Sequence, residues 1–92
     1  MACSLTGEGI AERAGQWQQV LSSAEREEID DGVCLVVPAE RAGQIAELAA
    51  AEQQCCPFFD FRLHLDGPVL RLEVRAPAEG TALLTELFTP AA

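Results

Sequence analysis

The chain has 92 residues, of which 49% are hydrophobic, so it is long enough for one compact domain and too short for two. Its formal charge of -9 produces a field that repels phosphate backbones and anionic lipid surfaces, which excludes nucleic acid and membranes as direct partners. The sequence shows neither an apolar run long enough to cross a bilayer nor a signal-peptide layout. We therefore expect a cytoplasmic protein whose four cysteines are thiols, metal ligands or packed side chains.

The first half of the chain predicts a strand, a helix and a second strand. Alternation over residues 2–5 indicates a short strand, and apolar residues at three- to four-residue spacing over residues 8–28 indicate an amphipathic helix anchored by Trp17. The segment 30–32 ends that helix. A continuous, largely β-branched run over residues 33–37 then predicts a buried strand.

The second half predicts a helix, a hairpin and a final helix. Their expected bounds are a helix over 40–54 ended by Pro57, a strand over 58–65, a turn at 66–68, a strand over 70–75 and a helix over 79–89. Because a helical crossover joins the strands at 33–37 and 58–65, we expect a mixed sheet covered by helices on one face. The predicted fold is a single α+β domain over residues 1–92, a two-layer sandwich, approximately ferredoxin-like, in the order β-α-β-α-β-β-α.

The candidate site lies at the end of the second predicted helix. Positions 52, 55 and 56 continue its apolar stripe, so Glu52, Cys55 and Cys56 share one side of the helix. A carboxylate on the buried side is costly unless a proton, an arginine or a metal ion pairs with it. Pro57 gives the chain a reason to unwind after Cys55, which lets both sulfur atoms reach one ion.

Cys3 has the inward parity of the strand predicted at residues 2–5. If that strand lies beside the end of the second helix, three thiols and one carboxylate converge: Cys3, Cys55, Cys56 and Glu52. Thiolates select soft ions such as Zn(II), Hg(II) or Cu(I), and binding displaces the thiol protons. The sequence predicts a soft-metal site with these four residues as ligands and no catalytic residues.

Structural roles are the alternative for each of these residues. Cysteine often acts as a small buried hydrophobe, which applies most strongly to Cys34 inside its predicted strand. Glu52 can instead cap a neighbouring element or pair with Arg41 or Arg62. His64 shares the solvent-facing parity of its strand and is interpreted as a surface residue.

Four segments resemble a family of small actinobacterial domains that occur alone or behind the DNA-binding part of MerR-type transcriptional regulators. These segments are Ala2–Leu5, Arg13–Trp17, Asp31–Val33 and Glu52–Phe61, the last carrying the motif E-x-x-C-C-P-F-F-x-F. The resemblance implies an effector-binding role, with Cys3, Glu52, Cys55 and Cys56 as the candidate site. Two departures are that no helix-turn-helix precedes Cys3, so we do not expect a complete regulator, and that Cys34 lies outside the family pattern.

The sequence therefore favours a non-enzymatic protein that binds a soft metal ion for sequestration, transfer or sensing. Two other functions stay open. One is a protein-interaction module with structural cysteines, which binds another chain or forms a homodimer. The other is a thiol redox protein, suggested by the vicinal cysteine pair alone.

Overall fold

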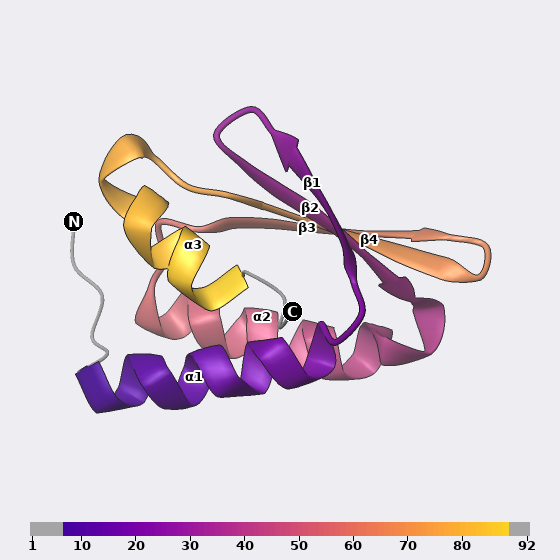
Figure 1. Cartoon of the computed structure of the whole chain (residues 1–92), viewed down its shortest axis with the longest axis horizontal. Helices are drawn as coiled ribbons and strands as arrows, with labels where there is room; N and C mark the ends of the chain where they lie inside the picture. The colour runs from indigo at the N-terminus through magenta and orange to yellow at the C-terminus, as the bar shows by residue number, and fades with distance from the viewer. Residues whose placement is uncertain (1–6, 89–92) are drawn as a thin grey trace.

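The computed structural model describes residues 7–88 as one layer of sheet and one layer of helices (Figure 1). The helices are α1 (Gly7–Val20), α2 (Ala42–Cys55) and α3 (Thr81–Phe88); the strands are β1 (Glu25–Ile29), β2 (Gly32–Pro38), β3 (Asp60–Asp66) and β4 (Val69–Arg75); short 3-10 turns, η1 (Ala39–Arg41) and η2 (Ala78–Gly80), precede α2 and α3. The predicted α+β class is confirmed. The strand predicted at residues 2–5 lies outside the described residues.

The sheet is antiparallel throughout, so the prediction of a mixed sheet is wrong. The strand order is β1-β2-β4-β3, and each neighbouring pair is antiparallel. A two-residue turn with Gly67 at φ 61° returns β4 directly beside β3. The inward residues of β4, Leu70, Leu72 and Val74, are fully buried, as a central strand requires. The strands β2 and β3, which α2 connects, are therefore not neighbours, because β4 lies between them.

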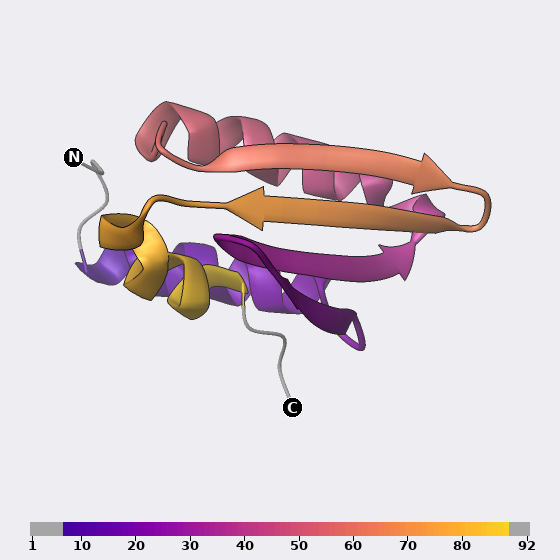
Figure 2. The same cartoon turned by 90° about the horizontal axis from the view of Figure 1, so that it is seen from above.

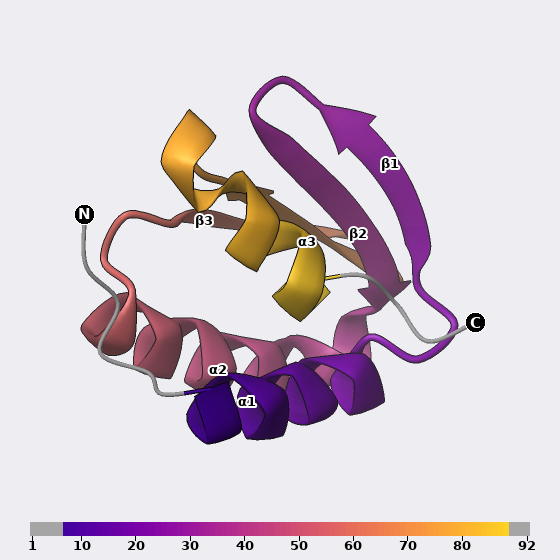
Figure 3. The ribbon, with the colours of Figure 1, turned by 60° about the vertical axis from the view of Figure 1, so that its left-hand side comes forward.

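The helix predicted over residues 8–28 is too long. It ends at Val20, and residues 25–29 form the edge strand β1, which pairs with β2 in a hairpin (Figure 3). Ser23 at φ 65° and Asp31 at φ 61° make the reversals before and after this strand. The charged sequence of β1 favours a helix locally, but pairing with β2 overrides that preference. Within residues 7–88 the order is thus α-β-β-α-β-β-α.

Trp17 is the centre of the core, as predicted. Its side chain is fully buried, and its ring centroid lies 4.7 Å from that of Phe88 and 6.1 Å from that of Phe61. Alternation predicts that residues 59, 61, 63 and 65 face inward, but burial follows this prediction only at the start: Phe59, just before β3, is buried and Phe61 is half-buried. At the other end Leu63 and Leu65 are 39% and 61% exposed, because the β3–β4 turn extends beyond the helical layer (Figure 2).

Gly32 marks the closest approach of β2 and β4. A Cβ atom added there would lie 1.9 Å from the carbonyl oxygen of Val74. We expect Gly32→Ala to lower the free energy of unfolding by about 3 kcal/mol, because the two central strands have to separate. Urea denaturation measures this loss. Gly43→Ala is the matched control: a Cβ at Gly43 meets nothing within 4 Å, so a comparable loss there would contradict the explanation.

Candidate metal centre

The carboxyl end of α2 carries the vicinal cysteines, and the predicted helix end is confirmed. The backbone N–H of Cys56 still donates to the carbonyl of Glu52, at 2.6 Å, but Cys56 itself has left the helix at φ -132°. Pro57, which has no N–H and restricts the residue before it, accounts for this break. Cys56 therefore remains one helical turn from Glu52 while its backbone is extended.

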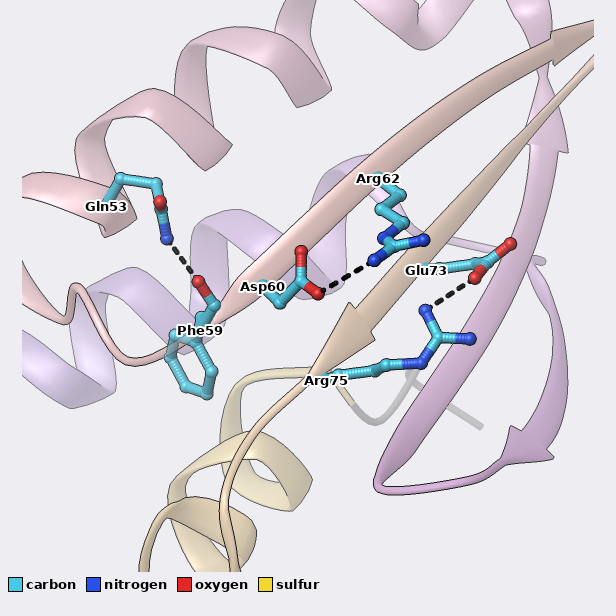
Figure 4. Close-up of polar contacts among 6 residues, drawn as sticks. All are labelled: Gln53, Phe59, Asp60, Arg62, Glu73 and Arg75. Carbon is cyan, nitrogen blue, oxygen red and sulfur yellow. Dashed lines mark hydrogen bonds and ion pairs between the residues drawn. The ribbon is translucent and has the colours of Figure 1, made fainter.

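A short loop connects this corner to β3 and is closed by two hydrogen bonds. The N–H of Phe59 donates to the carbonyl of Cys56 at 3.3 Å. The amide Nε2 of Gln53 donates to the carbonyl of Phe59 at 2.6 Å, as Figure 4 shows. These bonds fix the position of Cys56 relative to the last turn of α2 and to Phe59, the residue before β3.

The two vicinal cysteines have different states. Cys55 is half-buried and carries a free thiol. Cys56 is fully buried and disulfide-bonded. Cys34, like Cys55, carries a free thiol. Cys3, the third predicted sulfur ligand, lies outside the described residues as well.

Glu52 is a fully buried carboxylate with one satisfied oxygen. Its Oε1 accepts hydrogen bonds from Arg13 Nη1 at 2.9 Å and from Trp17 Nε1 at 3.2 Å. Its Oε2 is buried and has no hydrogen-bond partner among residues 7–88. Buried polar atoms are nearly always hydrogen-bonded, so an unpartnered carboxylate oxygen marks a position for a bound water or ion.

The alternative partners proposed for Glu52 make other contacts. Arg41 donates to the carbonyls of Val20 and Ser22 at the end of α1, and Arg62 pairs with Asp60 at 3.5 Å. A pairing of Glu52 with Arg41 or Arg62 is therefore wrong; the arginine is Arg13.

Sequence reasoning missed Arg13 because 39 residues separate it from Glu52. One signal was present: Arg13 and Trp17 are four residues apart and so share a face of α1. A cation and an indole N–H on the buried side of one helix match a carboxylate on the buried side of another.

Cys34 is buried within β2, as predicted, but on the sheet face opposite the helices. It lies opposite Glu27 of β1 and Glu73 of β4. Burial and the Glu73 carboxylate raise the pKa of the Cys34 thiol, Arg71 counteracts part of this shift, and Glu27 adds to it. Cys34 is therefore a protonated, packed side chain at neutral pH and lies apart from the vicinal cysteines.

This difference predicts the order of thiol modification. In the native protein we expect iodoacetamide to alkylate Cys55 before Cys34, because Cys55 is half-buried whereas Cys34 is 5% exposed and has a raised pKa. Peptide mapping over a time course measures the two rates. Unfolded protein serves as the control, since the rates should converge there; faster native alkylation of Cys34 would contradict the assignment.

Residues 7–88 contain no group of three or more His, Cys, Asp or Glu side chains that could hold a metal ion. Glu52, Cys55 and Cys56 lie within one helical turn, but the remaining predicted ligand is beyond this range. Over the same range, no helix has the length and apolar character needed to span a membrane.

Comparison with known proteins yields no relative. No family model, curated protein or solved structure matches the chain.

Proposed function

We propose that this protein is a non-enzymatic domain that binds a soft metal ion through Cys3, Cys55 and Cys56, with Glu52 beside the ion. The observation that carries this proposal is the buried Oε2 of Glu52, which lacks a hydrogen-bond partner within the described part of the chain and lies one helical turn from two adjacent cysteines. A cation bound there supplies the partner that this oxygen lacks and holds the cysteines as thiolates.

Cys3 is proposed as the third ligand because its place in the sequence gives it the inward parity of the strand expected at residues 2–5. Of the other three cysteines, Cys34 lies on the opposite face of the sheet, which leaves Cys55 and Cys56 at the end of α2 as its partners in the proposed site.

Reduction is the step that prepares the proposed site. The disulfide takes up two electrons and two protons from a thiol reductant and becomes two thiols, and the incoming ion then displaces thiol protons. We place the protein in the cytoplasm, where the glutathione and thioredoxin systems supply this reductant. Three thiolates suit Zn(II), Hg(II) or Cu(I), and a carboxylate oxygen or a water completes a four-coordinate site.

Native mass spectrometry tests this proposal. Protein reduced with a phosphine should form a one-to-one adduct with Zn(II) and with Hg(II), whereas oxidised protein should lose the Zn(II) adduct, because Cys56 is then held in a disulfide and cannot bind the ion as a thiolate. Cys34→Ser is the matched control and should keep both adducts, since Cys34 lies on the other face of the sheet. Failure of reduced protein to bind either ion in stoichiometric amount would contradict the proposal.

The resemblance to the effector part of MerR-type regulators supports a sensing role for the bound ion. The same chemistry also serves sequestration or transfer to a protein partner. These roles differ in whether a second protein recognises the metal-bound form, so a partner that binds only the loaded domain would distinguish sensing from storage.

A thiol redox function is the second candidate, and the disulfide of Cys56 next to the free thiol of Cys55 favours it. In this case the Cys55 thiolate attacks the disulfide and releases one of its sulfurs as a thiolate. Equilibration with glutathione buffers distinguishes the candidates: a redox protein reshuffles its disulfide readily among Cys3, Cys55 and Cys56, with or without metal.

A further inference from the structure

The strand β3 is an edge of the sheet that combines two exposed leucines with three charged residues. The strand order places β1 and β3 at the two edges. Four of the five residues of β1 are charged, so this edge repels another copy. By contrast, β3 is seven residues long and carries Leu63 and Leu65, the exposed large hydrophobic residues of the described chain. An edge of this kind is open to another strand.

The charge of the β3–β4 hairpin permits approach of a second copy. Residues 60–75 hold three arginines and three carboxylates, and their formal charges cancel, whereas the whole chain carries -9. These side chains are Asp60, Arg62, Asp66, Arg71, Glu73 and Arg75. Two copies that meet through this hairpin therefore avoid much of the mutual repulsion of the rest of the surface.

We propose that β3 pairs antiparallel with β3 of a second copy, with His64 on the two-fold axis, to form a symmetric dimer with a continuous sheet. In this register Arg62 lies opposite Asp66 of the second copy, and Leu63 lies opposite Leu65. Each pairing occurs twice because the interface is symmetric. Opposite charges and apolar side chains directly across an antiparallel pair are both stabilising.

Two other registers, with the axis at Leu63 or at Arg62, are less favourable. An axis at Leu63 places Asp60 opposite Asp66, and an axis at Arg62 places that arginine opposite itself; like charges in these positions are destabilising. The ion pairs that Arg62 and Asp66 make within one copy are weak and do not prevent pairing with a second copy. Arg62 pairs with Asp60 at 3.5 Å (Figure 4) and Arg71 with Asp66 at 3.7 Å. All four side chains are at least 43% exposed, so these pairs can rearrange.

Sedimentation velocity under reducing conditions tests the dimer without intermolecular disulfides. Wild-type protein should shift from monomer to dimer over roughly 1 µM to 1 mM. Leu65→Lys should remove the shift, because it places a charge in the apolar stripe of the interface. Gln18→Lys, on an exposed position of α1, is the matched control and should preserve it. A monomeric wild type over this range would overturn the proposal.

A charge exchange tests the register itself. Arg62→Asp and Asp66→Arg each place like charges opposite one another in a homodimer, so each variant alone should be monomeric. An equimolar mixture of the two variants should form a heterodimer, because both pairs between positions 62 and 66 then have opposite charges. Both substitutions are at exposed positions, so circular dichroism should show unchanged folding. A mixture that stays monomeric while the wild type dimerises would overturn the proposed register.

Discussion

Arg13→Leu is expected to lower the free energy of unfolding by about 3 kcal/mol, because it leaves a fully buried carboxylate without its cation. Arg13 is itself only 18% exposed, so water cannot replace its guanidinium fully. Trp17 Nε1 would remain as the donor to Glu52 among the described residues. Chemical denaturation of the metal-free, reduced protein measures the loss without a contribution from bound ion.

The double variant Arg13→Leu with Glu52→Leu is the control for this prediction. Removing both charges should recover most of the lost stability, because well-packed apolar side chains commonly replace a buried ion pair at little cost. A double variant as unstable as Arg13→Leu would show that the arginine contributes through packing of its alkyl chain instead. An Arg13→Leu variant with an unchanged free energy of unfolding would contradict a stabilising ion pair between Arg13 and Glu52.

Loss of a sulfur ligand is the second large effect. Cys55→Ser and Cys56→Ser are each expected to weaken Hg(II) binding by reduced protein by more than about 100-fold, since even changes to groups that only support a metal ligand cost 10- to 100-fold. Competition against a thiol chelator of known affinity measures the change. Cys3→Ser should have the same effect, because the proposed site needs all three sulfurs.

The serine series contains its own control. Cys34→Ser removes a thiol from the same chain but from the opposite face of the sheet, and it should leave the affinity unchanged. Equal weakening by all four substitutions would indicate non-specific thiol binding. Unchanged affinity in Cys55→Ser would contradict a site at the end of α2.

The elements best predicted from sequence are those whose pattern and packing agree. The apolar run of β2, the alternation in β4 and the break at Pro57 each have a local cause, and the structure confirms them. The strand β1 was missed because its charged residues favour a helix locally. Its strand conformation depends on hydrogen bonds with β2, which its own sequence does not reveal.

The strand order was missed for a different reason. A crossover helix between two strands of like direction suggested a parallel pair, but the tight turn at Gly67 competes for the same place and positions β4 between them. Similarly, alternation predicted that Leu63 and Leu65 face the helical side of the sheet. It could not predict that the helices leave this end of β3 uncovered.

In the candidate site, too, the features with a local cause were predicted and those that depend on tertiary packing were not. Helical spacing correctly placed Glu52, Cys55 and Cys56 within one turn at the end of α2. The pairing of Glu52 with Arg13 and Trp17 depends on how α1 packs against α2, which no local pattern determines. The convergence of Cys3 with this corner stays a prediction, because Cys3 lies outside the described residues.

X-ray absorption at the mercury edge tests the central claim most directly. The sample is reduced Cys34→Ser protein with one equivalent of Hg(II), so that the remaining sulfur ligands are those of the proposed site. Our account predicts three sulfur neighbours around each mercury ion, from Cys3, Cys55 and Cys56. Mercury with two sulfur neighbours or fewer would contradict a shared three-thiolate site.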